Sequence, residues 1–200
     1  MKKFTIESNS YLEKDIKGYF GCDYIGYQKA KNPDYINHLK NMSNQKGELD
    51  LIEDFIEATE KITEDFNKII DNEQMNFTVC VIPRSKAEKH YKQSQLMFRK
   101  VISCVADNLK MDNQTNAIKR VKDTKTTHNW RLENNTGDSP YKGITKDTCT
   151  IDEAKIENKN ILLVDDIYTH GVYIAEDCIQ LLLDLGAKSV ILYVAAKTRD

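Results

Sequence analysis

Residues 161–173 read Ile-Leu-Leu-Val-Asp-Asp-Ile-Tyr-Thr-His-Gly-Val-Tyr, and this stretch decides the fold. The four aliphatic residues at its start predict a strand that is buried on both faces. After a short Thr/Gly turn, an amphipathic helix is expected from about Val172 to Leu185. A strand, a loop and a helix in this order are typical of an α/β fold.

The polar residues of the same stretch predict a site for a phosphorylated ligand. Asp165 and Asp166 follow the aliphatic residues directly, and α/β sheets bind ligands at the carboxyl ends of their strands. The loop before the helix presents backbone amides that can hold phosphate, and its residues are Thr169, His170, Gly171, Val172 and Tyr173. Carboxylates beside such a loop can hold sugar hydroxyls or a hydrated Mg²⁺ ion.

Hydrophobic periodicity extends the α/β pattern to the rest of the chain. The spacing of apolar residues predicts helices over 48–70 and 93–109. Residues 77–82 and 189–196 are apolar runs that predict buried strands. We therefore expect a single α/β domain over residues 1–200, with a doubly wound, mainly parallel sheet flanked by helices.

Two segments interrupt this alternation. Residues 1–47 are rich in aromatics and glycine and are expected to form a small N-terminal appendage, with a short hairpin between residues 11 and 35. Residues 115–147 are basic and polar without a clear period, which predicts a long mobile loop. Loops of that length in a compact domain are usually either functional lids or disordered segments.

Composition narrows the classes of function. The 29 basic and 31 acidic residues give a net charge of −2, so no global field favours nucleic acid or an anionic membrane. The five cysteines are widely spaced and form no CxxC pair, as expected in a reducing compartment. No apolar run approaches the roughly 20 residues of a membrane helix, and the N-terminus does not resemble a signal peptide. We expect a cytoplasmic protein.

Paired acids at the end of a strand also occur in proteins of a different class. A phosphorylatable receiver domain has such a pair, but it would need several more strand–helix units, and only 35 residues follow Asp165. Alternatively, Asp165 and Asp166 serve only to cap the following helix. This capping role stays open, although it accounts neither for the Thr-x-Gly loop nor for the basic segment upstream.

The acidic stretch resembles a known signature. It is similar to the phosphoribosyl-pyrophosphate (PRPP) motif of type I phosphoribosyltransferases, in which an aliphatic strand, two acids and a Thr-Thr-Gly-x-Thr loop are consecutive. Within that superfamily the chain looks most like the competence-protein-F-type, amidophosphoribosyltransferase-like branch. The matching segments, in chain order, are Val79–Pro83, Arg120–His128, Val164–Gly171, Leu185–Val190 and Ala196–Arg199.

The resemblance implies roles for particular residues. Asp165 and Asp166 would bind the ribose 2- and 3-hydroxyls, directly or through Mg²⁺, and stabilise a cationic sugar. The loop residues Thr169 to Tyr173 would hold the 5-phosphate, although His170 and Tyr173 replace the usual threonines. Pyrophosphate would lie against Arg84, Ser85 and Lys86, and a mobile basic lid would contribute Arg120, Lys122 and Lys125.

Two functions follow from this resemblance. The first is an Mg²⁺-dependent phosphoribosyltransferase that releases pyrophosphate; its acceptor is not identified, because the chain offers no base-binding hood after its last strand. The second is a non-catalytic module that binds PRPP or a related nucleotide and regulates a partner, for instance in a toxin or defence system. A homodimer or a protein partner is expected in either case.

Overall fold

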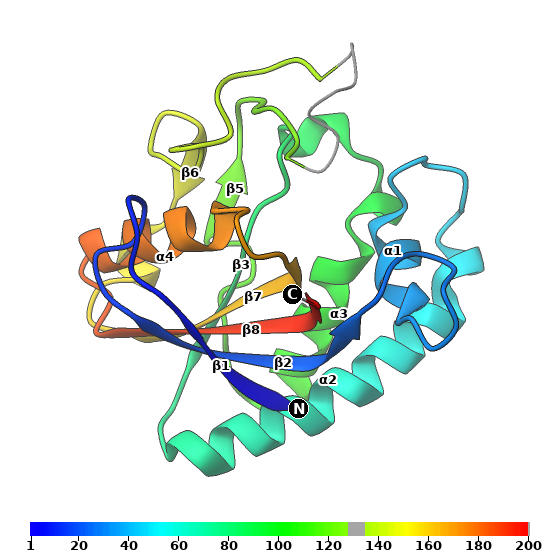
Figure 1. Ribbon diagram of the computed structural model, residues 1–200, viewed down its shortest axis with the longest axis horizontal. Helices are drawn as coiled ribbons and strands as arrows, with labels where there is room; N and C mark the ends of the chain where they lie inside the picture. Colours follow the sequence, from blue (N-terminus) through cyan, green and yellow to red (C-terminus); the bar gives the residue numbers. More distant parts are fainter. Residues whose placement is uncertain (128–134, 200) are drawn as a thin grey trace.

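The computed structural model describes residues 1–127 and 135–199 as a sheet with helices on both faces (Figure 1). Six strands of the described residues form the main sheet. In spatial order they are β1 (Lys2–Ile6), β2 (Ile16–Tyr24), β8 (Ser189–Thr198), β7 (Asn160–Tyr168), β3 (Thr78–Val81) and β4 (Asp112–Asn113). Only β1 runs antiparallel to its neighbour, so the expected α/β class with a mainly parallel sheet is confirmed.

Within the described residues, three α-helices cover one face of the sheet and one covers the other. They are α1 (Asp34–Lys40), α2 (Ile52–Glu73) and α3 (Met97–Asn108) on the first face and α4 (Ile174–Asp184) on the second. Figure 1 shows α2 and α4 on opposite sides of the strands. Short 3₁₀ turns add η1 (Leu49–Leu51), η2 (Glu88–His90), η3 (Gln93–Gln95) and η4 (Glu153–Lys155).

The two faces of β7 show why the aliphatic run forms a central strand. Leu162 and Val164 pack in the core beneath α1, α2 and α3, whereas Ile161 and Leu163 pack in the core beneath α4. All four side chains are fully buried. Burying each aliphatic side chain stabilises the fold by about 1.5–3 kcal/mol. A strand with a core on both sides therefore needs an unbroken apolar run rather than alternation.

The order of the strands creates a crevice between β3 and β7. After β3 the chain forms α3 and adds β4 on one side, and it later adds β7 on the other side of β3. Crossover helices therefore leave β3 and β7 toward different faces of the sheet. Ligands of open α/β sheets bind at such a switch point, beyond the carboxyl ends of the strands.

β7 is longer than the sequence indicated, because it continues through the two aspartates to Tyr168. It pairs with β8 over this whole length, up to Tyr168 opposite Lys197. Its pairing with β3 ends at Val81 opposite Val164. The edge of β7 that faces β3 is thus open from Asp165 onward, and this opening makes room for a pocket.

The N-terminal segment takes a different form from the one predicted. The hairpin expected within residues 11–35 is wrong, because residues 16–24 form one strand, β2, whose antiparallel partner is β1. On its other side β2 pairs in parallel with β8. Residues 2–24 therefore extend the main sheet, and pairing with β8 keeps residues 16–24 in one continuous strand through the glycines.

Residues 115–147 include a small element of regular structure. β5 (Ile118–Arg120) pairs with β6 (Cys149–Ile151) in a separate two-stranded sheet above α4. Part of the segment, residues 128–134, lies outside the described residues. None of the helices in the described part of the chain has the length and apolarity that a membrane crossing requires.

Candidate functional site

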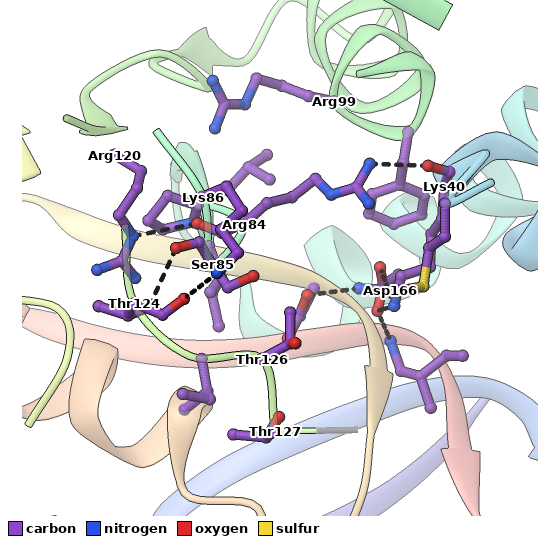
Figure 2. Close-up of a pocket in the computed structure, with 18 of the residues that line it drawn as sticks. Lys40, Arg84, Ser85, Lys86, Arg99, Arg120, Thr124, Thr126, Thr127 and Asp166 are labelled. Atoms are coloured by element: carbon purple, nitrogen blue, oxygen red, sulfur yellow. Dashed lines mark hydrogen bonds and ion pairs between the residues drawn. The ribbon is translucent and has the colours of Figure 1, made fainter. Parts of the chain in front are cut away.

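A pocket of about 310 Å³ lies at the switch point between β3 and β7 (Figure 2). Four segments contribute its walls: the end of β7 with the start of the following loop, residues 81–86 after β3, residues 120–127 of the basic segment, and the region of α1 and α3. The site residues predicted from the sequence that line it are Arg84, Ser85, Lys86, Arg120, Lys125, Asp165, Asp166, Thr169 and Val172.

The acid pair is held in a defined geometry. Asp166 accepts two contacts from the Lys40 ammonium, at 3.0 Å on Oδ1 and 2.9 Å on Oδ2. The Ile167 amide donates to Asp166 Oδ1 at 2.7 Å, and the Asp166 amide donates to Asp165 Oδ1 at 2.9 Å. Burial raises the pKa of Asp165, and the neighbouring Asp166 charge raises it further. A ligand that offers hydroxyl donors would relieve this unfavourable burial of charge.

Two residues of the loop after β3 that were predicted to contact pyrophosphate, Arg84 and Lys86, make hydrogen bonds to backbone carbonyls. Arg84 donates through Nη1 to the carbonyls of Lys40, at 2.7 Å, and Gln95, at 2.5 Å, and its guanidinium lies 4.3 Å from the Tyr91 ring centroid. Lys86 donates to the carbonyl of Thr124 at 3.1 Å. The cations thus lie at the pocket wall but are also fixed to the surrounding backbone (Figure 2).

The basic segment is joined to that loop. Thr124 donates through its amide and hydroxyl to the Ser85 carbonyl, at 2.8 and 3.1 Å. Arg120 is buried and donates to the Arg84 carbonyl at 3.1 Å. Its guanidinium also donates to the carbonyl of Gly143. Arg120 therefore supports the pocket wall from inside the fold.

The other two candidates of this segment differ in position. Lys125 is exposed and lines the pocket, while its amide donates to the Asp138 carbonyl at 2.9 Å. Lys122 pairs with the Asp138 carboxylate at 2.9 Å in solvent, and it is not one of the lining residues that the described chain provides. The pairing raises the pKa of Lys122. The predicted mobility of this lid stays a prediction.

The loop before α4 forms a tight turn. The Val172 amide donates to the Thr169 carbonyl at 3.0 Å, so this amide already has a partner. Gly171 has a φ of +80°, a left-handed conformation that favours glycine. Only Thr169 and Val172 of the loop border the pocket among the described residues, and α4 begins at Ile174 rather than at Val172.

Tyr173 and His170 lie away from the acid pair. The Tyr173 ring stacks on Tyr11 at a centroid distance of 5.0 Å and meets Tyr141 edge-on at 5.8 Å. These three rings, which we call the tyrosine cluster, join the β1–β2 connection, the basic segment and the turn before α4. His170 is exposed and borders a second cavity near the ends of β1 and β8.

The first turn of α4 carries two buried acids. Asp177 accepts the amides of Gly143 and Ile144, at 2.6 and 3.0 Å, and so fixes the end of the basic segment. Glu176 accepts the Tyr168 hydroxyl at 2.8 Å through Oε1, whereas its Oε2 has no hydrogen-bond partner among the described atoms. Burial raises the pKa of both carboxyls. Acids at a helix N-terminus also complement its dipole.

The sequence did not predict the part of the pocket wall that the end of α1 and the region of α3 contribute. This part of the wall includes the cations Lys40 and Arg99 and the apolar side chains Met42, Leu96 and Phe98. Met97, Val101 and Val105 gave α3 a clear period, but Lys40 lies in a polar stretch where no spacing distinguishes it. Counting all lining side chains, six are cationic and two are carboxylates, so the pocket favours an anionic ligand.

The donor set bears on the Mg²⁺ ion that the resemblance implies. The described residues contain no group of three or more His, Cys, Asp and Glu side chains that could hold a metal. Asp165 and Asp166 can contribute to such an ion only in company with ligand or water oxygens, because magnesium requires about six oxygens. The residues therefore fit the indirect coordination expected from the sequence.

Comparisons with known proteins add no family to this description. The sequence matches none of the protein-family models against which it was scanned, and no curated protein matches it. The site therefore has to be interpreted from its own chemistry: an acid pair, a cationic loop and a tight turn around one crevice of an α/β sheet.

Proposed function

We propose that the chain binds PRPP together with Mg²⁺ and transfers its phosphoribosyl group with release of pyrophosphate. The observation that supports this proposal is the pocket at the switch point. It gathers carboxylates suited to sugar hydroxyls, cations suited to phosphates and the turn before α4, although these lie in segments separated by about 80 residues. A type I phosphoribosyltransferase-like fold is part of the proposal.

The reaction would depend on positioning and charge. Cleavage of the C1–pyrophosphate bond develops positive charge on the ribose, which carboxylates stabilise if Asp165 and Asp166 hold the 2- and 3-hydroxyls. The turn of Thr169 and Val172 would receive the 5-phosphate. Mg²⁺, bound to the pyrophosphate, would neutralise charge on the leaving group.

The leaving group would meet the cationic wall. Arg84, Ser85 and Lys86 line the side of the pocket that faces the acid pair across the β3–β7 opening. Lys125 adds an exposed ammonium from the basic segment. These side chains would bind the pyrophosphate oxygens and hold its bond to C1 in line for departure.

A regulatory binding module is the second candidate, and one observation favours it. Arg84, Lys86 and Arg120 all donate to backbone carbonyls. Cations that are engaged in this way can line a binding pocket, but they contribute less to stabilising the charge of a leaving group. Such a module would bind PRPP or a related nucleotide and signal to a protein partner or a second copy.

Pyrophosphate release separates the two candidates. Wild-type protein would be incubated with PRPP, Mg²⁺ and a panel of purine, pyrimidine and amine acceptors, and pyrophosphate would be quantified. A transferase releases pyrophosphate with at least one acceptor, and Asp165→Asn/Asp166→Asn lowers the rate by more than about 100-fold. Asp184→Asn, an exposed change near the end of α4, is the matched control that keeps the wild-type rate.

The other outcomes are equally informative. Binding of PRPP by calorimetry without pyrophosphate release across the panel would support the regulatory module. If neither PRPP nor a nucleoside monophosphate binds, both candidates fail. An unchanged rate in the double variant would also contradict the transferase, because the proposed chemistry depends on the acid pair.

A further inference from the structure

Lys40 occupies a position that the activity proposed above does not explain. Its ammonium contacts both carboxylate oxygens of Asp166, at 3.0 and 2.9 Å (Figure 2). The two side chains are only 16% and 15% exposed, so the pair is largely removed from water. Coulombic attraction at such a distance is much stronger there than on an open surface.

The backbone around Lys40 fixes the ammonium in this position. The Lys40 carbonyl accepts Arg84 Nη1 at 2.7 Å. The next residue, Asn41, ends α1 in a left-handed conformation and donates to the hydroxyl of Ser94 at 3.2 Å, and its carbonyl accepts Gln95 Nε2 at the same distance. The end of α1 is thereby joined to the loop after β3 and to η3, and these are the same elements that line the pocket.

The acid pair therefore already has a cation. Asp166 also accepts the Ile167 amide, so its oxygens make three contacts with protein donors. A divalent ion that bound directly to Asp166 would have to displace Lys40 and lie close to a second positive charge. Mg²⁺ gives up its water ligands reluctantly, which makes this exchange still less favourable.

We infer that Lys40 is a built-in counter-ion that excludes direct divalent-metal binding at Asp166. Mg²⁺ then reaches the site only with a phosphorylated ligand. Lys40 acts as a specificity-determining residue, since its removal converts the acid pair into a metal site. The inference rests on the proposed function only for the identity of that ligand; the exclusion itself is a property of the protein alone.

Mn²⁺ without any nucleotide is the probe for this inference, with free Mn²⁺ measured by electron paramagnetic resonance. Lys40→Gln should bind one Mn²⁺ at least about tenfold more tightly than wild type, because a positive charge near the carboxylates is gone. Lys40→Arg should remain like wild type. Adding Asp166→Asn to Lys40→Gln should abolish the gain.

Lys46→Gln is the matched control, because Lys46 follows α1 but pairs with Asp54 at 3.6 Å outside the pocket. It should leave Mn²⁺ binding unchanged. Thermal melting would establish that each variant is folded, and Lys40→Met, which keeps the aliphatic stem, replaces Lys40→Gln if that variant unfolds.

Equal Mn²⁺ affinity in wild type and Lys40→Gln would overturn the inference, as would tight stoichiometric binding by the wild type. Failure of the proposed function looks different in this experiment. If PRPP does not bind but Lys40→Gln still gains Mn²⁺ affinity, the counter-ion role stands and only the ligand assignment falls.

Discussion

At the scale of single residues, the site is defined by buried charges that have few partners. Asp166 pairs with the Lys40 ammonium, Asp165 accepts the Asp166 amide, and Glu176 has one carboxylate oxygen without a hydrogen bond in the described structure. Unpaired buried charge costs stability, so a protein keeps it where a ligand or a structural link requires it. Glu176 links the first turn of α4 to the end of β7 through its bond to Tyr168.

Glu176→Gln should stabilise the protein in a pH-dependent way. Burial raises the folded-state pKa of Glu176, so the native protein holds this proton more tightly than the unfolded chain does. The resulting stability is complete below the ordinary glutamate pKa and is lost as the pH rises toward the folded-state pKa. Glutamine cannot ionise, and its benefit over wild type should therefore grow as the pH rises from 4.5 to 8.

Urea unfolding of wild type and Glu176→Gln at several pH values measures this difference. Taking the difference cancels the other titrating groups that both proteins share. A stability difference that stays constant, or that shrinks toward pH 8, would show that burial of the Glu176 charge does not destabilise the folded protein.

At the scale of elements, three connections meet around the turn before α4. Tyr11, Tyr141 and Tyr173 come from segments far apart in the chain, and their rings touch at centroid distances of 5.0–5.8 Å. The tyrosine cluster explains how a phenol fits into a loop where the resemblance leads one to expect a small hydroxyl. The ring packs outward, and the backbone of the turn stays beside the pocket.

A double-mutant cycle on Tyr11→Leu and Tyr173→Leu should reveal a coupling of about 0.5–1.5 kcal/mol in the free energy of unfolding. Either single variant removes the same stacking interaction, so the double variant loses it only once. Tyr27→Leu combined with Tyr173→Leu is the control, because Tyr27 lies half-exposed against His38. If the effects of Tyr11→Leu and Tyr173→Leu on the free energy of unfolding are additive, like those of the control pair, the tyrosine cluster does not hold the connections together.

Most of the helices and strands could be predicted from the sequence, but not all of them. Apolar runs and helical periods predicted β3, β7, β8, α2, α3 and α4 to within a few residues, because each buries a continuous stripe or both faces in a core. β1 was missed, since Phe4 and Ile6 alternate with Lys3 and Thr5 over only a few residues. β1 pairs with β2, and β2 pairs on its other side with β8 from the far end of the chain, so the place of β1 in the sheet follows from a long-range pairing.

The site residues that could be predicted are polar side chains that directly follow an aliphatic strand in the sequence. Asp165 and Asp166 follow an aliphatic run, and Arg84 follows another, so parallel pairing of the two strands brings them to one edge. Lys40 could not be found in this way, because the turn at the end of α1 decides where its side chain lies. Tyr173 was expected near phosphate, but contacts with two distant loops decide the direction of its ring.

At the scale of the whole molecule, the strand order and the pocket belong together. The chain places β4 and β7 on opposite sides of β3, and the pocket lies where these directions separate. Pairing of β3 with β7 ends one residue before the acids, whereas β8 supports β7 to Tyr168. The sheet thus holds Asp165 and Asp166 on a rigid strand beside an opening, as a precise binding site requires.

Calorimetric titration of PRPP with Mg²⁺ into wild-type protein and into Asp165→Asn/Asp166→Asn tests the central claim most directly. We predict one site in the wild type and an affinity at least about 100-fold lower in the double variant, because each charged hydrogen bond contributes about 1.5–3 kcal/mol. The acid pair would have no part in ligand binding if the double variant bound PRPP as tightly as the wild type. A wild type that bound no PRPP would contradict the proposed function.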